Sequence, residues 1–205
     1  MAIVINGSGT VTGIAVGGLP DGIVDAGTLA TDSVDSAELI DGAIDTAHIA
    51  TDQITSAILP TGSVLQVING NTSTAVTSTA TGTWVDTGIT ATITPSSTSS
   101  KIIVQINICG LWRNSGEIWN RAALQFLRGV TVIGVTAYAQ GWDRTTSENR
   151  EAGAMYSIYD SPSTTSATTY KVQFQSEVLS STTGIAVQKD GNSGQSNIFL
   201  YEIAG

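Results

Sequence analysis

The chain of 205 residues is acidic but sparing with charge: 41% of its residues are hydrophobic, 12% are charged, and the formal net charge is −9. This composition argues against a disordered polyelectrolyte, and the lack of a basic module argues against nucleic-acid binding. A single cysteine, Cys109, excludes a disulfide framework within one chain. We expect neither membrane insertion nor a signal peptide, because no apolar stretch reaches the length of a bilayer span and the N-terminus has no basic start.

Residues 1–18 are apolar and rich in glycine, with several residue types that favour extended structure. The segment is too short to fold alone. We interpret residues 1–18 as an extended attachment peg that becomes ordered by adding to another protein, as a strand adds to the edge of a sheet.

Residues 19–60 form a repeat. An aliphatic residue recurs there at every fifth position, and the members within this segment are Leu19, Val24, Leu29, Val34, Leu39, Ile44, Ile49, Ile54 and Leu59. On a continuous α-helix this spacing would scatter the aliphatic residues round the cylinder, and on a flat strand it would send them to alternate faces. Each unit must therefore contain its own turn. We interpret each ten-residue unit as a short helix-turn unit, with a triple-stranded or single-chain β-helix as the alternative.

One aliphatic residue in five cannot build a core within one chain. Identical copies round a symmetry axis would supply the missing partners in register, so we expect an oligomeric stem. Residues 1–62 hold eight acidic residues and no Lys or Arg, which predicts an acidic, solvated exterior. We predict no metal or other cofactor, because the aspartates lack the spacing of an EF-hand and His48 lacks partners for zinc.

Residues 61–205 follow a different pattern, with short segments of alternating polarity between clusters of turn residues. We expect a mainly β fold: an antiparallel β-sandwich of jelly-roll type that forms a knob after the stem. The predicted strands are 63–69, 83–85, 89–94, 101–112, 121–127, 131–137, 152–159, 168–175, 184–188 and 196–203.

Two segments of the knob combine tryptophan with charge, residues 112–121 and 138–151. Exposed aromatic residues beside Arg, Asn and Asp are typical of recognition surfaces, because a ring packs on a sugar while polar neighbours bind its hydroxyls. The alternative is that Trp112 and Trp119 belong to the core. The candidate ligand-binding residues are Trp119, Arg121, Trp142, Asp143, Arg144 and Asn149.

The sequence has no motif of nucleophilic or metal-dependent catalysis, and we predict that the protein is not an enzyme. The alternative is glycoside hydrolysis by a pair of carboxylates from the charged segments. Candidates for such a pair are Glu117, Asp143, Glu148 and Glu151.

Several segments resemble bacteriophage fibre proteins. Residues 5–22 resemble the beginnings of such proteins, and the ten-residue units resemble the V-T-T-A-K-I-A-D-G-A repeats of phage tail and head fibres. Residues 87–95, 99–104 and 200–205 resemble the heads of fibre and tail proteins. The resemblance implies a homotrimer on the surface of a virion, made in the host cytoplasm, attached to a virion protein through residues 1–18.

For the knob, the resemblance implies binding to a host-surface glycan or protein. It leaves two alternatives open. One is a capsid head fibre or decoration protein without strong host binding, and the other is a tailspike-like polysaccharide depolymerase.

Overall fold

The computed structural model describes residues 39, 44–45, 47–51, 53–55, 58–113, 122–136, 150–176, 184–189 and 194–205. These residues contain ten strands and no helix, so the fold is mainly β as predicted. The strands lie in the compact unit Thr55–Gly205. They are β1 (Val64–Thr72), β2 (Val76–Ser78), β3 (Val85–Ile93), β4 (Lys101–Arg113), β5 (Ala122–Arg128), β6 (Thr131–Thr136), β7 (Arg150–Asp160), β8 (Thr168–Ser176), β9 (Ile185–Val187) and β10 (Ser196–Ile203).

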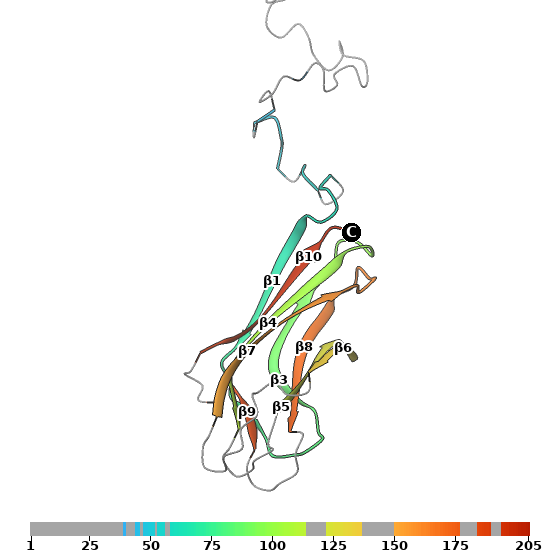
Figure 1. Cartoon of the computed structure of the whole chain (residues 1–205). Helices are drawn as coiled ribbons and strands as arrows, with labels where there is room; N and C mark the ends of the chain where they lie inside the picture. The colour runs from blue at the N-terminus through green and yellow to red at the C-terminus, as the bar shows by residue number, and fades with distance from the viewer. Residues whose placement is uncertain are drawn as a thin grey trace, which may run out of the picture. The chain divides into compact units, whose positions relative to one another are not determined.

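The strands form two antiparallel sheets, which face each other across a shared core (Figure 1). The first sheet runs β1-β10-β4-β9-β2, and β7 pairs with the other edge of β4. The second sheet runs β3-β8-β5-β6. The sandwich therefore places strands β1-β10-β4-β7 opposite strands β3-β8-β5-β6. This arrangement is consistent with the predicted jelly roll, because the chain passes repeatedly between the two sheets.

The core follows from alternating side chains. In β3, β8 and β10 every second residue is buried, because successive side chains of a strand point to opposite faces. The first sheet contributes inward aliphatic residues from β4 and β10, and the second contributes residues from β3, β5 and β8. The fully buried large side chains are Ile89, Ile93, Ile102, Ile106, Ile108, Leu111, Leu124, Tyr170, Phe174, Ile185 and Ile198.

Nine of the ten observed strands overlap predicted segments, and the prediction differs from the structure in two respects. The predicted segments 83–85 and 89–94 form one strand, β3, because Gly88 adopts a φ of +80° at an irregularity in its pairing with β8. Glycine tolerates this conformation, so the strand continues through it. The short strand β2 was not predicted, and it pairs with the equally short β9.

The described part of the stem contains regularly spaced turns. The amides of His48, Gln53 and Ile58 donate hydrogen bonds to the carbonyl oxygens three residues earlier, at 3.0, 3.2 and 3.0 Å respectively. A turn therefore recurs every five residues, and one member of the aliphatic series stands between consecutive turns. Turns are present in the part of the repeat that the structure describes, but these residues do not support the predicted helix-turn units.

The described aliphatic residues of this part are only about half covered. Leu39, Ile44, Ile49 and Ile54 are each 38–54% exposed, whereas the buried residues of the sandwich core are at most 7% exposed. The earlier predicted stem residues Leu19, Val24, Leu29 and Val34, and the predicted peg 1–18, lie outside the described residues.

Candidate functional site

The sandwich has two ends that carry different parts of the chain. The β3–β4, β5–β6 and β7–β8 connections lie at one end, where residues 60–63 lead into β1 and β10 finishes. We call this the proximal end. At the opposite, distal end, the last residue of β4, Arg113, pairs with the first residue of β7, Arg150. There also, the first residue of β5, Ala122, pairs with the last residue of β8, Ser176.

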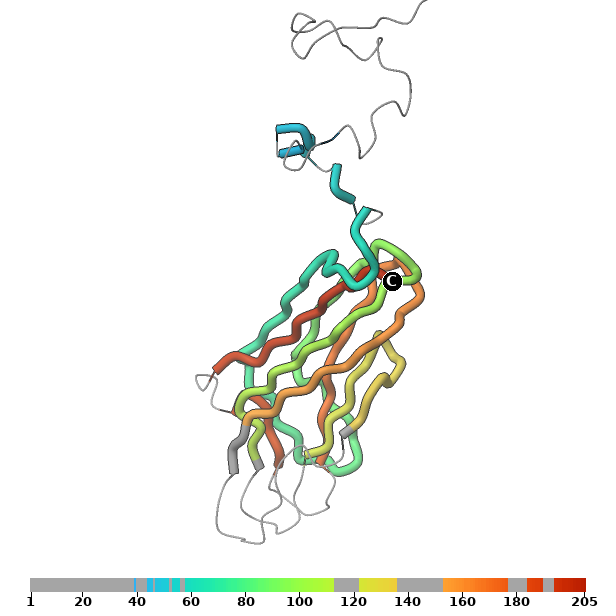
Figure 2. The backbone as a smooth tube through the Cα atoms, turned by 45° about the horizontal axis from the view of Figure 1, so that its top comes forward, coloured from blue at the N-terminus to red at the C-terminus, as the bar shows by residue number. Residues whose placement is uncertain are grey.

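The distal end gathers the flanks of both segments that were predicted to bind a ligand. Residues 114–121 connect β4 to β5, and residues 137–149 connect β6 to β7. The strand ends that flank the two segments lie at the distal end (Figure 2). Sequence reasoning treated the two segments separately, since the strand order that relates them depends on long-range pairing. The six candidates Trp119, Arg121, Trp142, Asp143, Arg144 and Asn149 themselves lie outside the described residues.

Among the described residues of the distal end, Trp112 and Lys189 contact each other. The Nζ atom of Lys189 lies 4.8 Å from the ring centroid of Trp112, which is the geometry of a cation–π interaction. Trp112 is half-buried, so it is neither a fully enclosed core residue nor a free aromatic residue. Sequence reasoning missed Lys189, because it belongs to a turn cluster without periodicity.

A hydrogen-bonded brace holds this part of the distal end. Gln188 adopts a left-handed φ of +50°, and its amide donates to the carbonyl oxygen of Cys109 at 3.1 Å. The Gln188 side-chain amide donates to Ser196 Oγ at 2.7 Å, and the same hydroxyl accepts a bond from the Cys109 amide at 2.9 Å. The brace joins β4, β10 and the residue after β9, so Lys189 is held on an ordered support.

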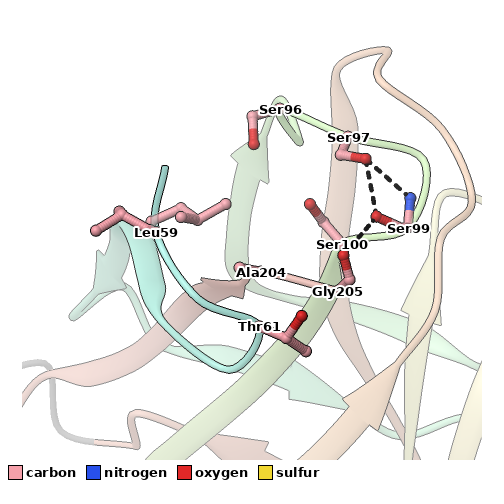
Figure 3. A pocket seen from close by; sticks show the side chains of 9 residues that line it. Leu59, Thr61, Ser96, Ser97, Ser99, Ser100, Ala204 and Gly205 are labelled. Atoms are coloured by element: carbon pink, nitrogen blue, oxygen red, sulfur yellow. Dashed lines mark hydrogen bonds between the residues drawn. The ribbon is translucent and has the colours of Figure 1, made fainter. Parts of the chain in front are cut away.

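The proximal end contains a pocket of about 380 Å³ (Figure 3). Its polar wall is the serine-rich β3–β4 connection. Ser99 Oγ donates to the carbonyl oxygen of Gly205 at 2.9 Å, and the Ser97 and Ser99 hydroxyls lie 2.9 Å apart. The Ser99 hydroxyl therefore joins the connection to the C-terminal residue, and the Ser97 hydroxyl bonds within the connection. The pocket is lined by Leu59, Thr61, Leu65, Ser96, Ser97, Ser99, Ser100, Ala204 and Gly205.

Behind this connection lies a buried carboxylate, Glu202, which has no exposed surface. Its Oε1 accepts hydrogen bonds from the amide and hydroxyl of Ser96, at 2.6 and 2.7 Å, and from the hydroxyl of Ser100 at 2.7 Å. Its Oε2 accepts a bond from Gln66 Nε2 at 2.5 Å. Burial alone would raise the pKa of Glu202, but the donors from Gln66, Ser100 and Ser96 outweigh it and lower the pKa. The carboxylate therefore clamps β1, β10 and the β3–β4 connection as an anion.

A second polar cluster lies at the same end. Arg128 Nη1 contacts both carboxylate oxygens of Asp160 at 2.8 Å, and the hydroxyl of buried Tyr170 donates to Asp160 at 2.7 Å. Burial raises the pKa of Tyr170, and the adjacent Asp160 raises it further, so the phenol stays protonated as a donor. The cluster joins the ends of β5, β7 and β8.

Comparison of the chain with protein-family models and with curated proteins found no match. Within the described ranges, no helix is long and apolar enough to cross a membrane. The same residues contain no group of three or more His, Cys, Asp or Glu side chains placed to hold a metal ion.

Proposed function

We propose that the chain is one subunit of a homotrimeric bacteriophage virion fibre whose β-sandwich knob binds a glycan or protein on the host surface. Residues 1–18 attach to a virion protein, the five-residue repeat forms the stem between the three chains, and the distal end of the sandwich meets the host. The observation that carries the proposal is the strand order, which gathers the flanks of segments 114–121 and 137–149 at the end opposite the entry from the repeat.

The composition of the two segments supports recognition. They hold two of the four tryptophan residues together with Arg121, Arg144 and several acidic residues, in a chain that is otherwise low in charge. Large aromatic side chains with Arg beside them dominate the binding energy of many interfaces. The Trp112–Lys189 contact places a further ring and cation on an ordered base at the same end.

The test is host adsorption by a chain that carries both Trp142→Ala and Arg144→Ala. We expect the amount of protein bound to host cells to fall by about tenfold or more, since two central residues of an interface commonly contribute over 1.4 kcal/mol together. The melting temperature should stay nearly unchanged, because the proposal requires both side chains at the surface, where substitutions usually cost less than about 0.5 kcal/mol.

The matched control is Lys171→Ala with Thr92→Ala, on the outer face of the second sheet, which should adsorb normally. Normal adsorption by a stable Trp142/Arg144 double variant would contradict the proposal. It would favour a capsid head fibre or decoration protein without strong host binding.

The place of the protein in the particle is tested separately. A gold-labelled antibody against the knob should decorate an appendage of the virion in particle images, and the mass of the purified protein should be three times the 21.1 kDa of one chain. We propose no catalytic role. Release of reducing sugar from host polysaccharide by the purified protein would instead identify a tailspike-like depolymerase.

A further inference from the structure

The outer face of the first sheet carries a row of apolar side chains, beside a row in which Asn69, Gln105 and Ser157 accompany Phe199. The strand register places Val67, Tyr201, Ile103 and Tyr159 side by side across β1, β10, β4 and β7. These residues alternate with buried residues in β4 and β10 and with partly buried residues in β1 and β7, so they point away from the core. Val67 is 51% exposed and Tyr159 is 66% exposed. The row is therefore open at both edges of the sheet in the single chain.

Further apolar residues flank this row. Phe199 stacks on Tyr201 with ring centroids 6.3 Å apart. Met155 lies four residues before Tyr159 in β7, on the same face, and is 66% exposed. Near the proximal end, Ile203 lies opposite Val64, which is 54% exposed. We call these residues, Val64, Val67, Ile103, Met155, Tyr159, Phe199, Tyr201 and Ile203, the apolar face.

The outer face of the second sheet is of the opposite kind. Asp86 accepts a hydrogen bond from Gln173 Nε2 at 2.7 Å and pairs with Lys171 Nζ at 2.9 Å. Gln173 in turn accepts a bond from Gln125, and the Thr92 and Thr169 hydroxyls lie 2.7 Å apart. These polar groups are paired within the face. The exposed apolar side chains of the second sheet, Val132 and Val135, both belong to its edge strand β6, whereas those of the apolar face extend across four strands.

The five-residue aliphatic series runs directly onto the apolar face. The five-residue spacing continues one step past residues 19–60, from Leu59 to Val64, and Val64 is the first residue of β1. The series requires identical copies to cover it. Chains that meet along the repeat up to Leu59 must therefore have the beginnings of their β1 strands close together. The residues next in reach of a second copy are those of the apolar face.

We infer that the apolar face is the contact between knobs, and that its occupant is a second copy of this chain. The inference rests on the proposed oligomeric fibre, and it names the surface by which the knobs of that fibre meet. Exposed apolar patches of a few hundred Å² on a soluble domain commonly mark interaction sites. A like patch on an identical chain complements it without any charged partner, and Lys101 stands at its border, opposite Ile203.

The size of the face explains why the stem is needed as well. Four strands about 4.8 Å apart and seven residues of about 3.3 Å give a face of roughly 440 Å². A standard interface buries about 800 Å² on each partner, so the face alone would associate weakly. The stem joins the chains and raises the local concentration of one knob near another, which makes a weak contact sufficient.

The test is the accessibility of single cysteines in the full chain with Cys109→Ala. Val67→Cys probes the apolar face, and Thr92→Cys probes the outer face of the second sheet as the matched control. We expect the Val67→Cys thiol to react with a maleimide roughly tenfold or more slowly than the Thr92→Cys thiol, because covered sites react only through local opening. Adding Ile49→Asp, to separate the stems, should bring the rate at Val67→Cys up to that of the control.

Tyr159→Cys, at the other edge of the face, provides a second probe that does not depend on β1. Light scattering on each variant separates the possible outcomes. An oligomer in which all three thiols react equally fast overturns the inference and leaves the fibre proposal standing. A monomer of the unaltered chain overturns both. Slow labelling of Val67→Cys that persists in a monomeric Ile49→Asp variant means that the chain itself covers the face, which also overturns the inference.

Discussion

The aliphatic residues of the sandwich and those of the stem are chemically alike, but the chain treats them differently. In the sandwich, alternation over β3, β4, β8 and β10 places them between two sheets, where Ile106, Val172 and Phe174 have no exposed surface. In the stem, one aliphatic residue follows each turn, and Ile44 and Ile54 are half exposed. The sandwich buries its apolar residues within one chain, whereas the proposed stem would bury them against other chains.

This contrast assigns two sources of stability to one molecule. Hydrophobic burial within the sandwich is independent of protein concentration, whereas burial along the stem of the proposed trimer would depend on association. A substitution in one region should therefore change a different measured quantity from a substitution in the other. Four experiments follow, in order of decreasing effect.

The largest effect is expected from Ile49→Asp. In a trimer this change places three carboxylates round one axis, and each costs several kcal/mol if it stays ionised and dry. We expect light scattering to show loss of the oligomer, while circular dichroism shows the β-sandwich intact. Thr51→Asp, two residues away in an exposed turn, should leave the oligomer mass unchanged. Equal loss in both variants would show that Ile49 does not face a partner.

The second largest effect, on the free energy of unfolding, is expected when a valine is changed to alanine in the core rather than at the surface. Val172→Ala removes two methyl groups from the fully buried core of β8 and should lower the free energy of unfolding by about 1.5–3 kcal/mol. Val130→Ala removes the same groups from a side chain that is 93% exposed, and it should change stability by less than about 0.5 kcal/mol. Urea denaturation measures both values. Similar losses would mean that Val130 is covered in the assembled protein.

A pH-dependent effect of intermediate size is expected at Glu202. Because its pKa is lower in the folded chain, its contribution is full above the unfolded pKa of about 4.3 and is lost as pH falls through the folded pKa. Glu202→Gln should cost about 1.5–3 kcal/mol at pH 7, since hydrogen bonds to a charged group are removed.

Thermal unfolding between pH 7 and pH 3 checks this expectation. The difference in melting temperature between the original chain and Glu202→Gln should narrow toward pH 3. The control is Asp86→Asn. The pKa of Asp86 is also lowered, because donors from Lys171 and Gln173 outweigh its slight burial, but its carboxylate is 58% exposed and the effect is screened by solvent. A constant difference across this pH range would show that the Glu202 carboxylate contributes through shape rather than charge.

The smallest effect is expected in a single turn of the stem. The Ala47 amide donates to Asp45 Oδ1 at 2.8 Å, in addition to the backbone bond that closes the turn. Asp45→Ala should change stability by less than about 0.5 kcal/mol but speed hydrogen exchange at the Ala47 amide. Asp45→Asn keeps an acceptor and should restore slow exchange. Unchanged exchange in Asp45→Ala would show that the turn does not depend on this side chain.

Strand positions were predictable because alternation is a local signal. The segment predicted as 196–203 is β10 with the same bounds, and the other long strands differ by one to three residues at their ends. The strand order was not predictable, because pairings such as Val67 with Tyr201 join residues from distant parts of the sequence. In the stem, too, one feature was predictable from the sequence and another was not. The spacing required a turn in each unit, but it did not determine that the described turns would be alike and non-helical.

The candidate site was predictable only in composition. Local sequence identified segments rich in tryptophan and charge, but the strand order was needed to bring their flanks to one end. The sequence does contain a signal for the burial of Glu202, because this residue shares the inward face of β10 with Ile198 and Leu200. A carboxylate in such a series must be buried with donors. Its donors come from β1 and the β3–β4 connection, which no local pattern relates to β10.

The position of β10 between β1 and β4 also sets the order in which the knob can fold. The ribosome makes β1 first and β10 last of these strands, so the facing edges of β1 and β4 stay unpaired until nearly all of the sandwich has been translated. Contacts between distant segments form slowly, and open strand edges invite pairing with other chains. Nascent subunits that share one polysome would therefore hold their open edges near each other before any single sandwich can close.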